Sequence, residues 1–178
     1  FLNKLFNKND ESENERVYQE INIDESKEHL NKVLVDLSKK SKVDLTKHTA
    51  RVALAMDYSG SMSNLFYNGS IQKTISRLLP IALKFDDNGE LESWLFSNKF
   101  KRLDAVNGEN YSNYVKDVME KSGMGMGGTE YAPVLKDMVT YYKDIELSDI
   151  PAFIIFITDG ENSDKYNTCL LYTSDAAD

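Results

Sequence analysis

Residues 51–63 read RVALAMDYSGSMS, and this stretch decides the fold. The apolar run from Arg51 to Met56 is too short for a surface helix. Its near-continuous hydrophobicity is typical of a strand that is covered on both faces of a parallel sheet. The run stops at Asp57, and Ser59 and Ser61 follow at alternate positions. The sequence therefore predicts a carboxylate and two hydroxyls at the carboxyl end of a buried strand.

A second buried strand is predicted near the end of the chain. Residues 151–158 read PAFIIFIT, which is the most apolar run in the sequence, and Asp159 and Gly160 come directly after it. Such a run predicts a central parallel strand. In α/β folds, ligands bind outside the carboxyl ends of the strands, where the strand order reverses. We therefore expect Asp57 and Asp159 at one edge of the sheet.

The remaining patterns predict a layered α/β fold. Apolar residues recur at helical spacing, with charged residues on the other faces, over residues 26–40, 71–85, 111–121 and 130–143. Pro80 lies inside the second of these segments and predicts a kink or a break there. Two short strands over residues 91–97 and 100–106 form a hairpin-like pair.

Composition narrows the class of protein. The chain has 178 residues, a formal net charge of −8 and scattered basic residues, so binding to a phosphate backbone is not expected, because that binding depends on clustered Lys and Arg. No apolar run is long enough to cross a bilayer, and no signal-peptide pattern is present. We expect a soluble, cytoplasmic protein with one main domain.

Both ends of the chain are set apart from this domain. Residues 1–25 are mostly charged or amide-bearing and predict a flexible polar lead-in, and residues 26–46 predict a helix and its connection. The last ten residues, CLLYTSDAAD, resemble a translated sequencing adapter. We expect residues 169–178, which include the sole cysteine, Cys169, to be non-native.

Oxygen-bearing side chains are the candidate functional residues. Asp57, Ser59 and Ser61 offer hard oxygen ligands, which suit Mg²⁺ or Mn²⁺ better than zinc. An Asp at a strand end followed by a serine-rich turn is the alternative interpretation. Thr129, after the glycine-rich GMGMGG segment, and Asp159 add two further donors. Thr129 also suits the N-cap of the helix that follows.

These five residues resemble a known motif. With GGTEYAP around Thr129 and FITDGENSDK around Asp159, the set Asp57, Ser59, Ser61, Thr129 and Asp159 is similar to the metal-ion-dependent adhesion site of von Willebrand factor A (vWA) domains. The stretches ARVALAMDYSGSM, LLPIALKFDDNGELESWLF and PAFIIFITDGENSDK resemble the bacterial tellurium-resistance, TerF-like branch.

The resemblance implies a fold. We expect a Rossmann-like, doubly wound, mostly parallel sheet with helices on both faces. Residues 47–168 would form a vWA domain that lacks its last strands and helices. That truncation would leave residues 152–158 as an unpaired apolar edge.

The resemblance also implies a function. Ser59 and Ser61 would bind Mg²⁺ directly, with Mn²⁺ or Ca²⁺ as possible substitutes, and Thr129 would bind directly or through water. Asp57 and Asp159 would act through water or as supporting carboxylates. A protein or peptide partner would supply a carboxylate to the open coordination position. The implied context is a bacterial tellurite or metal stress response; no oligomeric state is predicted.

Two alternatives to a binding module remain. The first is a Mg²⁺-dependent phosphoryl-transfer or hydrolase enzyme, and the second is a scaffold domain in which metal only stabilises a loop. We assign no catalytic residue, because His48 precedes the strand and lies roughly 20 Å from Asp57 at strand geometry. Glu161 and Asp164 are interpreted as solvated residues, and GMGMGG as a mobile loop that positions Thr129.

Overall fold

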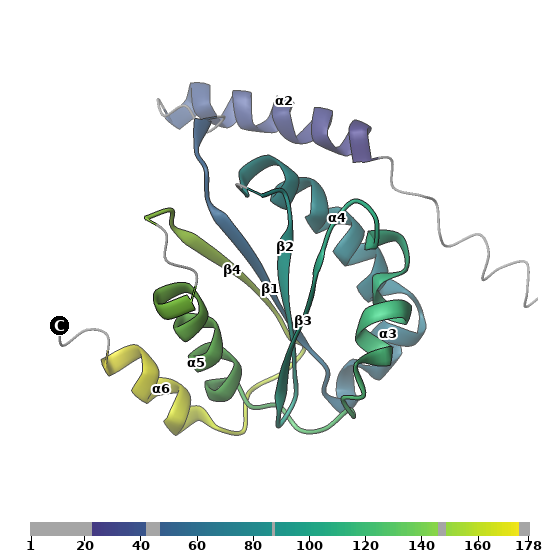
Figure 1. Ribbon diagram of the computed structural model, residues 1–178, viewed down its shortest axis with the longest axis vertical. Coiled ribbons are helices and arrows are strands. Elements are labelled where there is room, and N and C mark those ends of the chain that lie inside the picture. Colours follow the sequence, from purple (N-terminus) through teal and green to yellow (C-terminus); the bar gives the residue numbers. More distant parts are fainter. Residues whose placement is uncertain (1–22, 42–46, 87, 146–148, 175–178) are drawn as a thin grey trace, which may run out of the picture.

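The computed structural model describes residues 23–41, 47–86, 88–145 and 149–174. Within them, one four-stranded sheet has the order β3-β2-β1-β4 (Figure 1). Its strands are β1 (Arg51–Asp57), β2 (Leu91–Phe96), β3 (Phe100–Val106) and β4 (Ala152–Ile157). Strand β1 is parallel to β2 and β4, whereas β3 is antiparallel to β2. The predicted mostly parallel α/β fold is confirmed.

The central strand β1 is buried along its whole length. Leu54 and Met56 face one core cluster, and Ala53 and Ala55 face another. The alanines lie on the face that holds Trp94 and the other aromatic side chains of the second cluster. Small residues on β1 leave room for these large rings, so both faces of the sheet are closely packed. This explains why the run has no polar alternation.

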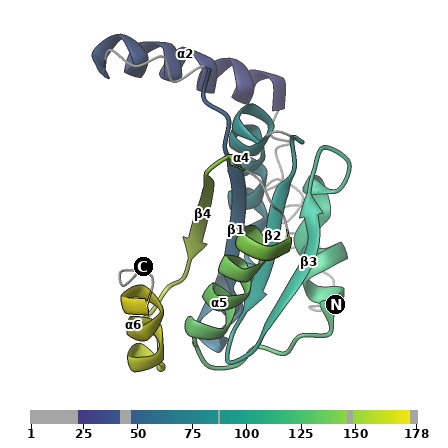
Figure 2. The same ribbon diagram turned by 60° about the vertical axis from the view of Figure 1, so that its left-hand side comes forward.

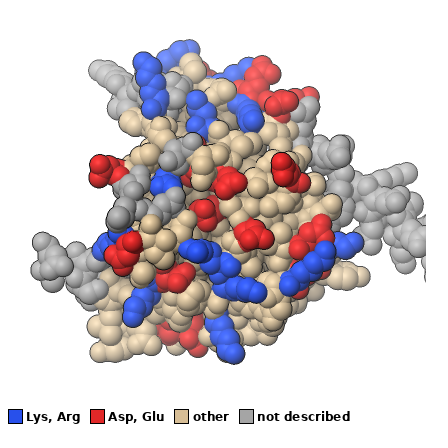
Figure 3. Space-filling view, viewed as in Figure 1, with Lys and Arg blue, Asp and Glu red and all other residues tan. Residues whose placement is uncertain are grey.

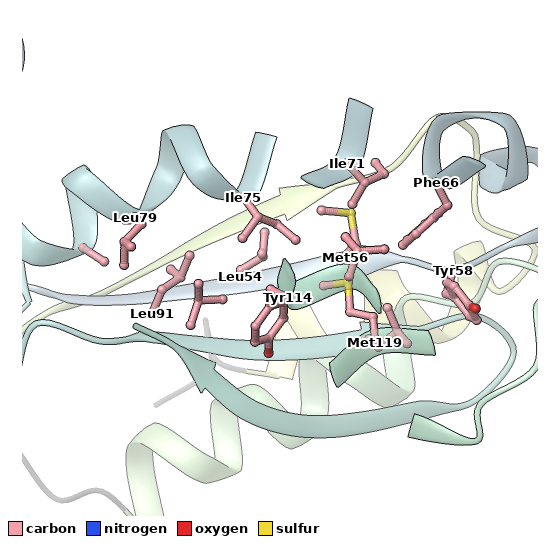
Figure 4. Packing of buried hydrophobic residues seen from close by; sticks show 14 of the residues in the cluster. Leu54, Met56, Tyr58, Phe66, Ile71, Ile75, Leu79, Leu91, Tyr114 and Met119 are labelled. Atoms are coloured by element: carbon pink, nitrogen blue, oxygen red, sulfur yellow. The ribbon is translucent and has the colours of Figure 1, made fainter. Parts of the chain in front are cut away.

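Helices cover both faces of the sheet. Helix α4 (Ser70–Phe85) packs on one face and α5 (Ala132–Thr140) lies on the other (Figure 2). Figure 4 shows the α4 side, where the helix meets β1 and β2. The labelled buried side chains there are Leu54, Met56, Tyr58, Phe66, Ile71, Ile75, Leu79, Leu91, Tyr114 and Met119. Fully burying one aliphatic or Phe side chain contributes about 1.5–3 kcal/mol, so this layer stabilises the fold substantially.

Helix α4 continues through Pro80, so, of the predicted kink or break, the break is wrong. The helix runs without interruption from Ser70 to Phe85. Proline removes one backbone hydrogen bond and crowds the preceding turn. On either side of Pro80, Ile75, Leu79 and Ala82 are completely buried against the sheet. Packing of this face therefore outweighs the local preference for a break.

Residues 111–122 do not form the single helix that their spacing predicts. They form three short turns, η4 (Tyr111–Asn113), η5 (Val115–Met119) and η6 (Glu120–Ser122). Gln72 of α4 explains the first interruption. Its amide donates to the Tyr111 carbonyl at 2.5 Å, and its side-chain oxygen accepts from the Val115 N–H at 3.0 Å. In an α-helix the Val115 N–H would donate to the Tyr111 carbonyl, but here the Gln72 side chain bonds to both groups instead.

The peripheral elements complete the fold. Helix α2 (Ile23–Ser41) packs on α4, and the turn η7 (Tyr141–Ile145) extends α5. Helix α6 (Lys165–Ser174) contacts α5 and includes six residues of the segment interpreted as non-native. The predicted lead-in lies outside the described residues except for its last three positions, which belong to α2. None of the described helices is both long and apolar enough to cross a membrane.

Strand β4 is the edge of the described sheet. Its outer surface leaves Phe153 61% and Ile154 37% exposed, whereas Ile155 and Phe156 are partly buried. The sequence predicted a strand covered on both faces, and also an apolar edge in a vWA domain without its last strands. Among the described residues the prediction of a central, fully covered strand is wrong, because β4 pairs only with β1 and its first three residues are exposed. The expected apolar edge is the arrangement that the described sheet has.

Candidate functional site

Asp57 is the buried centre of the site. It ends β1, and its side chain is completely inaccessible to solvent. Carboxylate oxygen Oδ1 accepts the Ser59 N–H at 2.7 Å, and Oδ2 accepts the Thr158 hydroxyl at 2.7 Å. In the described part of the chain, no Lys, Arg or His forms an ion pair with Asp57. A buried carboxylate is costly unless it is paired, bonded or close to a metal ion.

A row of hydroxyls leads from Asp57 towards solvent. The Ser61 hydroxyl donates to Asp159 Oδ1 at 2.8 Å, and its oxygen lies 3.0 Å from the Ser59 hydroxyl oxygen. A serine hydroxyl has one proton and two lone pairs. Because Ser61 gives its proton to Asp159, Ser59 is the donor in the contact between the two serines. Both oxygens therefore keep lone pairs for another ligand.

This row runs from the interior to the surface. Ser59 is only 2% exposed, whereas Ser61 and Asp159 are exposed. Residues from the end of β1 and the end of β4 thus meet at one edge of the sheet, as predicted. The meeting point is the carboxyl edge, because β1 and β4 are parallel neighbours (Figure 2).

The glycine-rich segment is fixed beside this edge. Gly127 forms a parallel bridge with Ser59, and its carbonyl accepts the Gly60 N–H at 3.0 Å. The Glu130 N–H donates to the Ser97 carbonyl at 2.9 Å. Anchored backbone positions therefore lie on both sides of Thr129. Its predicted positioning for a metal ion stays a prediction.

Thr129 is not the cap of the following helix. Helix α5 begins at Ala132, and its N-cap position is Tyr131. The Thr129 carbonyl accepts the backbone N–H of Ser163 at 2.8 Å and the Ser163 hydroxyl at 2.9 Å. Within the described residues, the Thr129 hydroxyl has no hydrogen-bond partner. The cap interpretation is wrong. The two bonds tie Thr129 to the loop that follows β4, but among the described residues no hydrogen bond joins Thr129 to the other four predicted ligands.

Gly127 closely approaches the side chain of Asn98. A Cβ atom at this position would lie 2.4 Å from Asn98 Oδ1 and 3.4 Å from the Ser97 hydroxyl oxygen. The first distance is below van der Waals contact, so any side chain would displace Asn98. A glycine lets the loop lie against both Ser59 and the turn after β2.

Asp164 caps α5, and sequence reasoning missed this role. Its carboxylate accepts the N–H groups of Tyr131 at 2.9 Å and Ala132 at 2.7 Å. Burial acts to raise the pKa of Asp164, but these two bonds and one from Asn162 outweigh it, so the pKa lies below its ordinary value. The interpretation of Asp164 as solvated is therefore wrong. The sequence around Asp164 gave no signal of its contact with Ala132, which lies 32 residues earlier in the chain.

Tyr131 is a second functional candidate that the sequence did not reveal. Its ring packs edge-on against Phe96 and Phe156, with centroid separations of 5.7 and 4.8 Å. Its hydroxyl lies 2.6 Å from the Gly160 carbonyl oxygen and 3.1 Å from the Thr158 hydroxyl oxygen. The tyrosine thus contacts the loop that connects Thr158 with Asp159.

Other candidates lie away from the site or within the core. His48 lines an apolar pocket of about 510 Å³, together with Pro151 and Phe153, at the amino ends of β1 and β4. His48 is therefore at the amino ends of the strands, whereas Asp57 is at the carboxyl end of β1. Tyr58 is buried against Phe66.

Two further residues lie on the surface. Tyr67 is 92% exposed. Glu161 is exposed and pairs with Lys165. The face drawn in Figure 3 carries Lys and Arg interspersed with Asp and Glu. No strongly basic patch is seen on that face.

The donor set fits a hard divalent cation. Carboxylate and hydroxyl oxygens are the ligands that Mg²⁺ prefers. Nowhere in the described ranges do three or more His, Cys, Asp or Glu side chains group as a metal site. An ion at this edge would therefore depend on the hydroxyls of Ser59, Ser61 and Thr129. The buried, unpaired charge of Asp57 is the feature that such an ion would offset.

Comparison with known proteins places the chain in a family. Residues 49–177 match the sequence model of the vWA-TerF-like family, which is described as the vWA domain found at the C terminus of TerF. The chain belongs to the vWA-TerF-like family. This vWA chain is also 42% identical over 134 residues to the uncharacterized protein YcbR of Bacillus subtilis (strain 168). The match covers 71% of the chain and 55% of YcbR, so it spans about half the length of that relative.

A solved structure also resembles the vWA chain. It is the crystal structure of the ArnB paralog VWA2 from Sulfolobus acidocaldarius, with 18% sequence identity and a TM-score of 0.42. The likeness covers 67% of this chain and 29% of the other.

Proposed function

We propose that this vWA domain is a divalent-cation-dependent protein-binding module. Asp57, Ser59, Ser61, Thr129 and Asp159 would hold the ion, with Mg²⁺ as the expected species and Mn²⁺ or Ca²⁺ as substitutes. When bound, the ion would offer an electron-poor coordination position to an incoming oxygen ligand. The partner would be a protein or peptide that presents a carboxylate.

The burial of Asp57 supports this proposal most strongly. Its carboxylate is completely buried and has no cationic partner among the described side chains. Hydrogen bonds from Ser59 and Thr158 offset part of the cost of removing the charge from water. A divalent ion beside the neighbouring serine oxygens would offset the rest.

The shape of the site supports a role in binding an external ligand. The hydroxyl row ends at Ser61 and Asp159, which are exposed. An octahedral Mg²⁺ normally retains several waters, and a partner carboxylate can displace one of them. Two acidic residues of the site, Asp57 and Asp159, would balance the charge of a divalent ion, so a further carboxylate would bind through the metal and not through a protein cation.

A thermal melt in excess Mg²⁺ and in chelator tests the proposal. A ligand that binds only the folded state adds about 2.7 kcal/mol at a concentration about a hundred times its Kd. We expect this stabilisation in the wild-type chain and not in Ser59→Ala. Ser63→Ala is the matched control, because Ser63 is an exposed serine at the start of α3 (Ser63–Tyr67). Equal melting temperatures with and without Mg²⁺ in the folded wild type would refute the proposal.

The proposal is binding and not catalysis. A serine nucleophile needs a nearby base, and His48 lies at the opposite edge of the sheet from Ser59. Release of nitrophenol from p-nitrophenyl phosphate in the presence of Mg²⁺ measures the alternative. Hydrolysis that is lost in Ser59→Ala would favour a phosphoesterase instead.

A scaffold role makes a different prediction. In that case, Mg²⁺ would stabilise the fold, but an immobilised acidic peptide library would bind equally well in Mg²⁺ and in chelator. We also propose a role in a bacterial tellurite or metal stress response. That part of the proposal is supported only by likeness to the TerF-like branch.

A further inference from the structure

We propose that Tyr131 and Thr158 are positioning residues that orient the Asp57 carboxylate for cation binding. This inference rests on the proposed function and extends it to two side chains outside the expected ligand set. Thr158 reaches Asp57 directly, and Tyr131 acts through Thr158 and Gly160. Thr158 directly follows β4, and Tyr131 directly precedes α5.

Counting protons fixes the direction of the bonds around Thr158. Its hydroxyl has one proton, which can go to Asp57 Oδ2 at 2.7 Å or to the Gly160 carbonyl at 3.3 Å. The carboxylate is both nearer and charged, so it is the stronger acceptor. Thr158 therefore donates to Asp57 Oδ2. This bond restricts the rotation of the Asp57 carboxylate.

Two hydrogen-bond donors also lie close to the Thr158 hydroxyl oxygen. The Gly160 N–H lies 3.3 Å away, and the Tyr131 hydroxyl lies 3.1 Å away. Tyr131 itself donates its proton mainly to the Gly160 carbonyl, at 2.6 Å. The tyrosine hydroxyl thus closes the turn after β4 around Thr158 and limits the rotamers that Thr158 can adopt.

Tyr131 is held rigidly enough to carry out this role. Its backbone N–H is bonded to Asp164, and its ring packs edge-on against both Phe96 of β2 and Phe156 of β4, which also pack against each other. Both the main chain and the ring are therefore fixed independently of the hydroxyl. Removal of the hydroxyl alone should leave the packing intact while releasing the turn.

The expected effect is on cation affinity. Removal of a hydrogen-bond partner that orients a metal ligand typically weakens the affinity for the metal 10–100-fold. Thr158→Val keeps the shape of the side chain but removes the proton donor to Asp57, so we expect about a ten-fold weaker site or worse. Tyr131→Phe removes a more distant contact and should weaken binding by a smaller factor. Thr158→Ser restores the hydroxyl and should bind nearly as well as the wild type.

Titration with Mn²⁺ alone, followed by electron paramagnetic resonance of the free ion, measures these affinities. Tyr166→Phe is the matched control, because this tyrosine of α6 is 76% exposed. Trp94 provides a fold control for each variant. It is the sole tryptophan, it is buried, and its indole donates to Asp137 of α5 at 2.7 Å. Its emission should be the same in all variants.

The double variant gives a second readout that a merely structural role would not move. If both residues act along one path, the loss of Mn²⁺ affinity in Tyr131→Phe with Thr158→Val should be smaller than the product of the two single losses. Wild-type affinity in Thr158→Val and Tyr131→Phe, with Mn²⁺ still binding to the wild type, would overturn this inference and leave the proposed function intact. No Mn²⁺ binding by the folded wild type would overturn both.

Discussion

The cap that Asp164 provides for α5 gives a prediction of defined size. Substitution Asp164→Ala removes the acceptor for the Tyr131 and Ala132 N–H groups. Loss of an N-cap side chain costs about 0.5–2 kcal/mol, and bonds to a charged acceptor contribute about 1.5–3 kcal/mol each when buried. Because Asp164 is only partly buried, we expect the free energy of unfolding to fall by about 2 kcal/mol at neutral pH.

The pH dependence of this loss tests its cause. The folded pKa of Asp164 is lowered, so the carboxylate stabilises the fold fully above its unfolded pKa of about 3.9. The contribution is lost as the pH falls through the lower, folded pKa. The difference between wild type and Asp164→Ala should therefore be largest near neutral pH and should shrink towards about pH 2.

Urea unfolding in the presence of chelator, across a pH series, measures both effects. Chelator removes any contribution from bound cations. Asp117→Ala is the matched control, because Asp117 is exposed and its described hydrogen-bond and ion-pair partner is Lys121, four residues later. We expect a small change there. An Asp164→Ala loss that is the same at neutral and at acid pH would refute the charged-cap reasoning, since an uncharged packing contact has no reason to titrate.

Two further substitutions test the core and the irregular turns. Leu54→Ala removes a completely buried side chain between β1 and α4 and should lower the free energy of unfolding by about 2–5 kcal/mol. Urea unfolding measures this loss. A loss below that range would mean that the surrounding side chains relax to fill the space. Gln72→Met keeps the volume but leaves the Val115 N–H without its acceptor, so we expect a loss of about 1–3 kcal/mol and faster hydrogen exchange at Val115. Unchanged exchange at that amide would show that Gln72 does not hold the turn.

The sequence predicted the sheet well, because strand signals there are local. Residues 100–106 form β3 with the predicted bounds. The predicted strand over 51–56 is one residue shorter than β1, and the one over 151–158 is one residue longer than β4 at each end. Continuous hydrophobicity identifies a buried strand without knowledge of its neighbours. Helical periodicity was less decisive over residues 111–122, where Gln72, some 40 positions earlier, breaks the pattern.

The candidate site was predicted in part. Asp57, Ser59, Ser61 and Asp159 form one connected set of hydrogen bonds because the parallel pairing of β1 with β4 brings their carboxyl ends together. Their metal-binding role stays a prediction. Asp164, Tyr131 and Thr158 could not be assigned from the sequence, because their roles depend on contacts between residues far apart in the chain. Only the fold shows which hydroxyl faces which carboxylate.

Hydrogen bonds at the carboxyl ends of β1 and β4 join residues that are far apart in the chain, and this has a consequence for biosynthesis. Thr158 lies 101 positions after Asp57, and Asp159 lies 98 positions after Ser61. At about 5–20 residues per second, a ribosome takes roughly 5–20 s to make this interval. For that time the apolar strand β1 waits in a nascent chain without β4 beside it. The growing polypeptide should therefore depend on chaperones that shield exposed strands until the last strand emerges.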